Sequence, residues 1–229
     1  MPIDETSPIE VTALAWVPPF ARGFVRDLRV RWALEEIGLA YRVRLIGGTG
    51  SMARGPARPE NYLNEQPFGQ VPVYKEGALC LFESGAIVLH IGAKDERLLP
   101  RDEPGRSRAI AWMFAALNSI EPQTFMLAAA TIFFGDAPWS AGARTAVTPL
   151  VAQRLAHLSA ALGDKDWLEG RFTIGDLMMV DALRAIPDQT LIAAHPNLAG
   201  YVARGTARPA FKRAMAAQLA NFMSDQAAA

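Results

Sequence analysis

One stretch, residues 64–92, constrains the fold more than any other. In it a Val-Pro bond at 71–72, a pair of strands and the start of a helix follow one another directly. The pattern predicts strands at 71–74 and 78–82, joined by a turn in which Gly77 can adopt the positive φ that a tight turn needs. An apolar segment of helical character then begins at Ser84. The stretch therefore predicts a hairpin followed at once by a helix, a β-β-α unit.

Two dipeptides in this stretch carry chemical meaning. Val71-Pro72 is an X-Pro bond beside a strand start, where a cis peptide bond could turn the backbone of Val71 outward rather than into the ladder. Glu83 and Ser84 stand at the helix start, where a carboxylate can receive an ammonium group, and a hydroxyl with free amides can receive a carboxylate. Together they predict a site for a peptide-like ligand that carries an α-amino acid head.

The residues before this stretch predict a strand, a helix and a second strand. Residues 9–16 and 41–46 alternate in hydrophobicity as strands do, whereas apolar residues recur at helical spacing over 24–37. A loop with two prolines and a glycine at 17–23 precedes the helix, and Gly38 is placed as a C-cap residue. A strand, helix and strand of this length predict a right-handed βαβ unit, which together with the β-β-α unit gives a thioredoxin-like order of elements.

The chain is predicted to divide into two domains. A loop rich in Gly, Ser and Pro at 47–59 lies inside the first half, and a charged, proline-bearing segment at 93–105 is interpreted as a linker. No convincing strand follows that linker, so the second half is predicted to be entirely helical. We therefore expect a thioredoxin-like, ligand-binding domain at 1–92 and an all-helical domain at 106–229.

Two capping patterns predict helix starts in the second half. Thr148 places a capping hydroxyl before Pro149, which suits the first helical position, so a helix is expected from there to about residue 162. Thr173 and Asp176 have the spacing of a capping box, with Asp in place of the usual Glu. We interpret this box as a structural cap rather than as a catalytic pair.

Composition excludes several classes of protein. Lys plus Arg and Asp plus Glu both number 23, a balance that favours neither nucleic acid nor an anionic membrane as a partner. The apolar stretches are too short to span a bilayer, and the first residues lack the features of a signal peptide, so a cytoplasmic location is expected. Cys80 is the single cysteine, which excludes an internal disulfide, and it lies in an apolar strand where a core position is expected.

The histidines give no sign of a metal centre. His90, His157 and His195 are far apart in the sequence, and no carboxylate or cysteine stands near them at metal-ligand spacing. We expect no bound metal.

The motifs resemble a known site. Asn-x-x-Pro-Phe-Gly-Gln-Val-Pro at 64–72, followed by Leu-Phe-Glu-Ser-x-Ala-Ile at 81–87, resembles the glutathione site of the glutathione transferases, and the resemblance extends over nearly the whole chain. It implies a thioredoxin-like N-terminal domain, a helical C-terminal domain, a homodimer and glutathione as co-substrate, with detoxification as the role. Relatives without transferase activity share this scaffold, so the resemblance is more specific for fold than for activity.

The resemblance also implies roles for individual residues. Glu83 and Ser84 match the ligands of the γ-glutamyl head, and Val71, followed by Pro72, would pair its backbone with the cysteinyl part of glutathione. Gln70 could reach the glycyl carboxylate, or could simply be an exposed glutamine.

The group that usually activates the glutathione thiol is missing. In the family this group is a Tyr on the first strand, or a Ser or Cys in the loop that opens the first helix. The corresponding positions hold Trp16 and Phe24, and residues 13–40 contain no Ser, Thr, Cys or Tyr. Neither side chain can donate a proton from oxygen or sulfur.

Other groups near the first helix could stabilise a thiolate instead. The amides of Arg22, Gly23 and Phe24 are expected at a helix N-terminus, where the partial positive charge favours an anion. Arg22 and Arg26 could add full charges, with Arg22 the first candidate. The alternative is that both arginines are solvated or paired with acidic side chains.

The second substrate would be small and apolar. Met113, Phe114 and Leu117 could line its pocket, or could simply belong to the helical core. The expected activity is transfer of glutathione to an electrophile, or reduction of a peroxide or mixed disulfide. The alternative is a non-catalytic glutathione- or ligand-binding scaffold, which the missing hydroxyl favours. A dithiol oxidoreductase is disfavoured because the first helix has no cysteine.

Overall fold

A computed structural model describes residues 3–49 and 54–222. By their contacts the described residues form two compact units, the first drawn from Met1–Asp95 and Pro209–Ala229 and the second from Glu96–Arg208. The predicted 47–59 loop is described except for residues 50–53, which lie outside the described residues.

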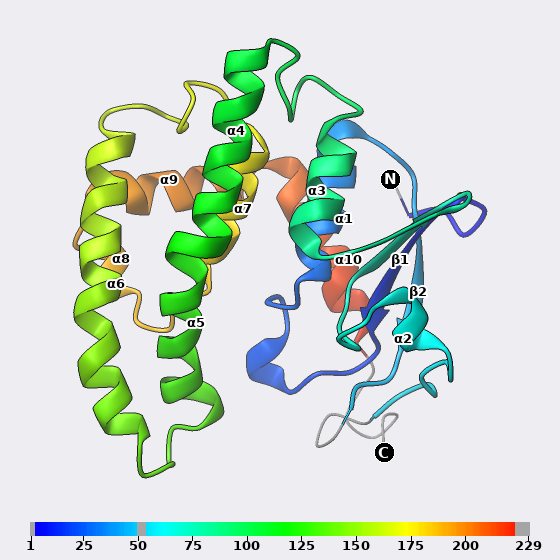
Figure 1. Ribbon diagram of the computed structural model, residues 1–229, viewed down its shortest axis with the longest axis horizontal. Helices are drawn as coiled ribbons and strands as arrows, with labels where there is room; N and C mark the ends of the chain where they lie inside the picture. Colours follow the sequence, from blue (N-terminus) through cyan, green and yellow to red (C-terminus); the bar gives the residue numbers. More distant parts are fainter. Residues whose placement is uncertain (1–2, 50–53, 223–229) are drawn as a thin grey trace. The chain divides into compact units, whose positions relative to one another are not determined.

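The first unit is built on a four-stranded sheet with the order β2-β1-β3-β4. Its strands are β1 (Ile9–Leu14), β2 (Arg42–Ile46), β3 (Val73–Glu76) and β4 (Leu79–Phe82). β1 runs parallel to β2, with Val11 opposite Val43, and antiparallel to β3, with Val11 opposite Tyr74. This is the predicted combination of a βαβ unit and a hairpin, and it gives a thioredoxin-like sheet (Figure 1).

Helices cover this sheet on both sides. α1 (Asp27–Ile37) and α3 (Ser84–Gly92) lie on one side, and the short α2 (Tyr62–Glu65) lies on the other (Figure 1). Gly38 ends α1 with a φ of 75°, and Gly77 turns the hairpin with a φ of 59°, both as predicted. The helix predicted from residue 24 begins later, at Asp27, because a single 3-10 turn at η1 (Pro19–Ala21) and further turns occupy the preceding residues.

The last helix belongs to the first unit. α10 (Pro209–Asn221) packs along α1, where the ring of Phe211 meets the ring of Trp32 edge-on at 4.9 Å. Arg213 Nε donates to Glu35 Oε2 at 2.6 Å, so a charged contact adds to the apolar one. The sequence pattern instead predicts that these residues belong to the helical domain, and the domain boundaries at 1–92, 93–105 and 106–229 remain a prediction.

The described part of the second unit is helical throughout. Its elements are α4 (Glu103–Ala115), the π-helical η3 (Ala116–Ile120), α5 (Glu121–Ala128), the π-helical η4 (Ala129–Phe133), α6 (Ser140–Leu162), α7 (Ile174–Arg184), α8 (Thr190–Ala193) and α9 (Pro196–Ala207). No helix among the described residues is both long enough and apolar enough to cross a membrane.

One helix start differs from its prediction. α6 begins at Ser140 and carries Pro149 in its interior, so the helix start predicted at Thr148-Pro149 is wrong. Contacts made before the proline explain the difference: the hydroxyl of Ser140 donates to the carbonyl of Phe134, and Arg144 Nη1 donates to the carbonyl of Ala130 at 2.6 Å. Tertiary contacts therefore extend the helix through a residue that ordinarily ends one.

The capping box at the start of α7 is confirmed. Thr173 Oγ1 accepts from the amide of Gly175 at 3.2 Å, and Asp176 Oδ2 accepts from the amide of Thr173 at 2.9 Å. The other carboxylate oxygen of Asp176 accepts from the amide of Leu168 and from the hydroxyl of Tyr201, both at 2.9 Å. Burial nevertheless raises the pKa of Asp176. The box is structural, as interpreted, because these partners occupy both oxygens.

Candidate functional site

The Val71-Pro72 bond and the start of α3 lie next to each other in the first unit. The Val71-Pro72 bond is cis, and β3 begins only at Val73, so Val71 lies outside the ladder. Val73 stands opposite Phe82 in the β3–β4 pair. The residue before one strand and the residue after the other, Pro72 and Glu83, therefore meet at the same end of the hairpin.

Glu83 has a backbone conformation that few side chains adopt. Its φ is 68°, the one positive value at a non-glycine among the residues that the structure describes. Such a conformation is retained where the surroundings require it, often at a site of function. The carboxylate of Glu83 does not cap α3, and the residue is exposed, so the side chain is available to a ligand.

Ser84 is the first residue of α3, and a cation lies beside it. The serine is 4% exposed, and its hydroxyl accepts a hydrogen bond from Nη1 of Arg29 at 3.4 Å. Arg29 is itself buried on α1. The first amides of an α-helix have no partner within the helix, so this corner combines a hydroxyl, amides and a positive charge. It is suited to a carboxylate.

The loop that carries Gln70 and Val71 is fixed from α2. The hydroxyl of Tyr62 donates to the carbonyl of Gln70 at 2.6 Å, and Gln66 Oε1 accepts from the amide of Phe68 at 2.7 Å. Arg58 donates to the carbonyl of Gly69 and lies over the ring of Tyr62, 4.8 Å from its centre. Burial raises the pKa of Tyr62 to about 12, so the hydroxyl remains a donor over the physiological range. The side chain of Gln70 is exposed.

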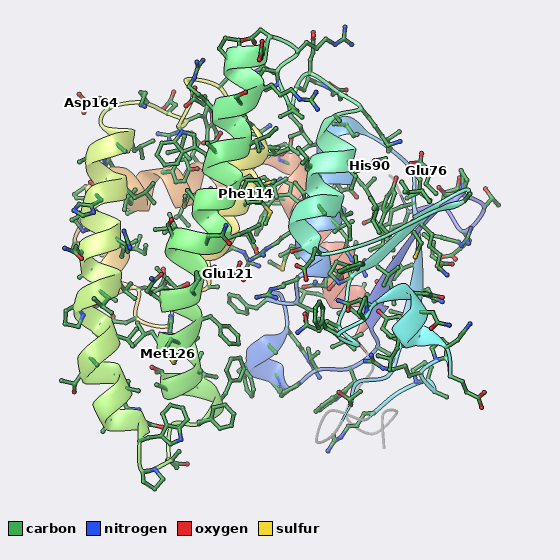
Figure 2. All side chains as sticks on the ribbon, viewed as in Figure 1. Glu76, His90, Phe114, Glu121, Met126 and Asp164 are labelled. Atoms are coloured by element: carbon green, nitrogen blue, oxygen red, sulfur yellow. The ribbon has the colours of Figure 1, made fainter. Side chains whose placement is uncertain are left out.

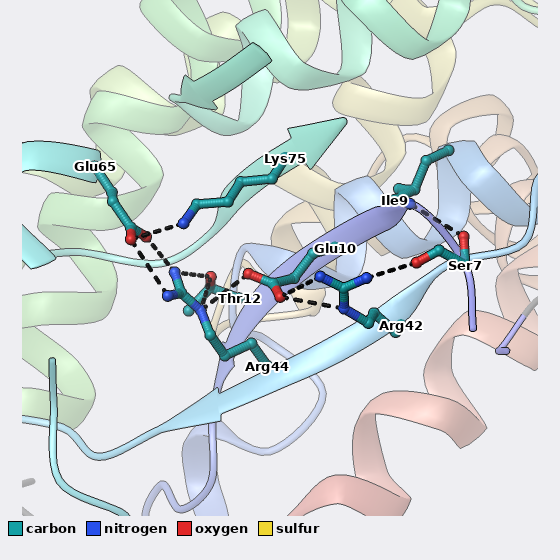
Figure 3. A network of polar contacts seen from close by, with 8 residues as sticks. All are labelled: Ser7, Ile9, Glu10, Thr12, Arg42, Arg44, Glu65 and Lys75. Carbon is teal, nitrogen blue, oxygen red and sulfur yellow. Dashed lines mark hydrogen bonds and ion pairs between the residues drawn. The ribbon is translucent and has the colours of Figure 1, made fainter. Parts of the chain in front are cut away.

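A network of charges ties α2 to the sheet (Figure 3). Glu65 of α2 accepts from Arg44 and from Nζ of Lys75, the latter at 2.7 Å, and Arg44 also contacts Glu10 and Thr12. Burial of Glu65 opposes its ionisation, but the bonds from Arg44 and Lys75 outweigh burial and lower its pKa. The network therefore holds Glu65, the last residue of α2, against the sheet, directly before the loop that leads to Val71.

The loop before α1 corrects one expectation. The amides of Arg22 and Phe24 donate to the carbonyls of Pro19 and Ala21, at 3.3 and 3.0 Å, so they do not stand free at a helix N-terminus. These internal bonds form because the chain makes separate turns before the helix begins at Asp27. Two of the three amides predicted to stabilise a thiolate are therefore already used.

The side chains in and before this loop differ in how far they are exposed. Arg22 and Arg26 are half-buried, and Arg26 is the residue that precedes α1. Phe24 is 48% exposed, whereas Trp16 is buried, with the guanidinium of Arg54 4.3 Å above its ring. Neither aromatic supplies a proton to a thiol.

Asp27, which could have paired with those arginines, is held by two other residues. Its Oδ2 accepts from Nε of Arg31 and its Oδ1 from Nε2 of Gln218, each at 2.7 Å. Burial raises the pKa of Asp27, against the lowering effect of Arg31 and Gln218.

The residues proposed for a co-substrate pocket belong to the second unit. Met113 and Phe114 lie on α4 and Leu117 on the π-helical segment that follows it. Met113 is 1% exposed and packs in the core, whereas Phe114 is 49% exposed (Figure 2) and Leu117 is intermediate. Of the three, Phe114 has the most surface to offer a substrate.

Cys80 is exposed, so its predicted core position is wrong. The reason is the sheet order, which places β4 at an edge that the sequence alone did not reveal. Partial burial still raises the pKa of the Cys80 thiol. His90 contacts Glu76 at 3.1 Å, and the described residues contain no group of three or more His, Cys, Asp or Glu side chains arranged to hold a metal ion.

Sequence reasoning missed Arg29, Arg54, Arg58 and Gln218. Arg29 meets a partner 55 residues away and Gln218 one 191 residues away, so no local pattern marks either of them. A glutamine within an otherwise ordinary helix gives no signal at all.

This chain is similar in sequence to several known proteins. Residues 21–93 match the family model described as glutathione S-transferase, N-terminal domain. A disulfide-bond oxidoreductase of Escherichia coli is 29% identical over 84% of this chain and 91% of its own, and a glutathione S-transferase of Hyoscyamus muticus is 27% identical over 82% and 92%.

Solved structures show the same fold. A glutathione transferase family member of Pseudomonas fluorescens, with two glutathione bound, aligns with a TM-score of 0.78 at 23% identity, over 92% of this chain and 94% of its own. A glutathione transferase of Burkholderia graminis aligns with a TM-score of 0.76 at 24% identity, over 90% and 87%. The fold is that of the glutathione transferases, a thioredoxin-like sheet with a helical second part. The family model thus covers residues 21–93, and the likeness to solved structures shows the fold of the chain.

Proposed function

We propose that this protein is a glutathione transferase-type enzyme that binds glutathione at the corner formed by Val71, Pro72, Glu83 and Ser84. The observation that carries the proposal is the strand register, which brings Pro72 beside Glu83 at the first turn of α3. Each part of glutathione has a matching group there, and relatives named glutathione S-transferase support the same function.

The contacts follow from the chemistry of the tripeptide. The α-carboxylate of the γ-glutamyl head would bind the Ser84 hydroxyl and the first amides of α3, with Arg29 supplying positive charge. The α-ammonium group would pair with Glu83, the cysteinyl backbone with that of Val71, and the glycyl carboxylate with Gln70. All these groups belong to the first unit.

Thiol activation would depend on charge rather than on a hydroxyl. Because the amides of Arg22 and Phe24 are engaged in the loop, the side chains of Arg22 and Arg26 are our candidates to stabilise a thiolate. The thiolate would attack a small apolar electrophile, a peroxide or a mixed disulfide. The relative named disulfide-bond oxidoreductase supports including the disulfide. Phe114 and Leu117, beside the buried Met113, are our candidates for the co-substrate surface.

Calorimetric titration with glutathione tests the site. We expect binding by the wild type and loss of binding in Glu83→Ala and Ser84→Ala, with Glu60→Ala and Ser107→Ala as matched controls at exposed positions. Binding that survives in both site variants would place the ligand elsewhere, and no binding by the wild type would sink the proposal.

The second candidate is a non-catalytic glutathione-binding scaffold. The absence of Ser, Thr, Cys and Tyr from residues 13–40 favours it. The ultraviolet absorbance of bound thiolate separates the two candidates. A bound thiol with a pKa below its free value, lost in Arg22→Met and Arg26→Met, supports the enzyme, and an unshifted pKa supports the scaffold.

A homodimer is also part of the proposal, together with a cytoplasmic location and a role in detoxification. Leu63, Phe68 and Phe82 of the first unit are 62%, 71% and 37% exposed, and the rings of Phe68 and Phe82 meet edge-on at 6.4 Å. Exposed apolar side chains gathered in this way suit a second copy of the chain. Sedimentation equilibrium should show a dimer, and Phe68→Ser should shift it toward monomer.

A further inference from the structure

The loop that would hold the glutathione thiol rests on the C-terminal helix. Nε2 of Gln218, on α10, donates to the carbonyl of Val25 at 3.0 Å and to Oδ1 of Asp27 at 2.7 Å. Gln218 is 1% exposed. One amide group therefore fixes the last turn of the loop and the first residue of α1 together.

A second contact joins the same loop to the same helix. Gly23 has a φ of +84°, and a Cβ placed on it would lie 3.0 Å from Sδ of Met215. Only glycine suits both the backbone conformation and the close approach. The loop backbone thus lies directly against α10 at two points, Gly23 and Val25.

The chemistry of the contact fixes the orientation of the Gln218 amide. Its two neighbours, a carbonyl and a carboxylate, both accept hydrogen bonds, so the NH₂ group and not the oxygen must face them. An isosteric side chain without donors would leave Oδ1 of buried Asp27 without its partner on α10, and the Val25 carbonyl would keep only its bond from the Leu28 amide, at 3.0 Å. The loop would then be free to shift at the point where Arg22 and Arg26 are placed.

We propose that Gln218 is a positioning residue for thiol activation: it holds the 22–26 loop so that Arg22 and Arg26 can face the glutathione sulfur. The inference rests on the proposed function, because it assumes that this loop receives the thiol. It assigns the C-terminal helix a part in the site although that helix supplies no ligand contact of its own.

Arg213 provides a matched control. It lies on the same helix and binds the other end of α1, where its Nε donates to Glu35 Oε2 at 2.6 Å and its Nη2 to the Glu35 carbonyl at 3.2 Å. Gln218→Met and Arg213→Met each replace a long polar side chain of α10 by the same apolar one. Both weaken the packing of α10 on α1, but only the first releases the loop.

The experiment combines four readouts on the full chain. In Gln218→Met we expect amide hydrogen exchange to accelerate in residues 20–26 and the bound thiol pKa to rise. We expect kcat/KM to fall about 10- to 100-fold, as misplacement of catalytic groups does. S-methylglutathione, which has no thiol, should bind as in the wild type. Arg213→Met should leave loop exchange and thiol pKa unchanged.

The outcomes test the positioning role of Gln218 and the proposed function separately. Equal effects of the two variants, or unchanged exchange in residues 20–26 of Gln218→Met, would overturn the positioning role. Failure of the wild type to bind glutathione would overturn the proposed function and with it the catalytic part of the inference. The exchange comparison needs no ligand and would still decide whether Gln218 fixes the loop.

Discussion

Arg29 on α1 donates a hydrogen bond to the hydroxyl of Ser84 at the first turn of α3, across 55 residues of sequence. Both side chains are buried, so a full positive charge lies at the helix start where we place the γ-glutamyl carboxylate. A charge held in place before the ligand arrives needs little rearrangement on binding.

Removal of this charge should weaken glutathione binding. We expect Arg29→Met to lower the affinity about tenfold or more, the size of a charge-assisted hydrogen bond, and Arg29→Lys to restore part of the loss. Calorimetric titration measures both, with Arg42→Met as a control that loses an ion pair to Glu10 on β1. An affinity unchanged in Arg29→Met would remove Arg29 from the site.

Glu76 predicts a loss of stability in acid. Its pKa is lowered to about 2, first by the bond from Lys94, which outweighs burial, and then by the bonds from His90 and Tyr74. This pKa lies below 4.5, the ordinary value for a glutamate, so ionised Glu76 stabilises the fold above pH 4.5. This stability is lost as the pH falls from about 4.5 toward about 2. Urea unfolding from pH 6 to pH 2 should therefore show a smaller fall for Glu76→Gln than for the wild type; equal falls would contradict the prediction.

The hydrogen bonds that the buried carboxylate of Asp176 accepts should contribute strongly to the free energy of unfolding. Asp176→Ala leaves the Leu168 amide and the Tyr201 hydroxyl without their acceptor, and we expect a loss of about 3 kcal/mol or more in the free energy of unfolding. Tyr201→Phe removes one bond and should cost about 1 kcal/mol. Urea titration measures both; a larger loss for Tyr201→Phe than for Asp176→Ala would contradict this account.

Pro149, inside α6, should destabilise that helix. Pro149→Ala restores a backbone donor within a continuous helix, and we expect an increase of about 1 kcal/mol or more in the free energy of unfolding. Ala152→Gly, in the same helix, should have the opposite sign. Destabilisation by Pro149→Ala would mean instead that the proline shapes how α6 packs.

Cys80 should be reachable by a thiol reagent in the native protein. Because the thiol is exposed but its pKa is raised, we expect one modified thiol per chain, slowly at pH 7 and faster above pH 9. Modification rates across this range test the prediction, and Cys80→Ser supplies the blank. A thiol that reacts only after denaturation would contradict its exposed position.

The sequence predicted the features that depend on neighbouring residues. Gly38 and Gly77 end a helix and turn a hairpin because glycine adopts a positive φ more readily than other residues, and Thr173 caps α7 by its spacing from Asp176. That Val71 and Ser84 lie close together could also be predicted, since a short hairpin joins them.

Features set by distant contacts could not be predicted. Cys80 is exposed because of the order in which strands join the sheet, and α6 passes through Pro149 because Ser140 and Arg144 are held by the preceding helical segment. Gln218 gains its position only when the two ends of the first unit come together.

The contribution of α10 to the first unit has a consequence for biosynthesis. The sheet and α1 leave the ribosome before α10 does, and Asp27 and Glu35 meet their partners on α10 only after a further 191 and 178 residues have been synthesised. During translation the face of α1 that later packs against α10 must therefore stay exposed to solvent or be covered by another protein. A nascent chain stalled before residue 209 would carry the corner at Ser84 but lack the support beneath the loop that precedes α1.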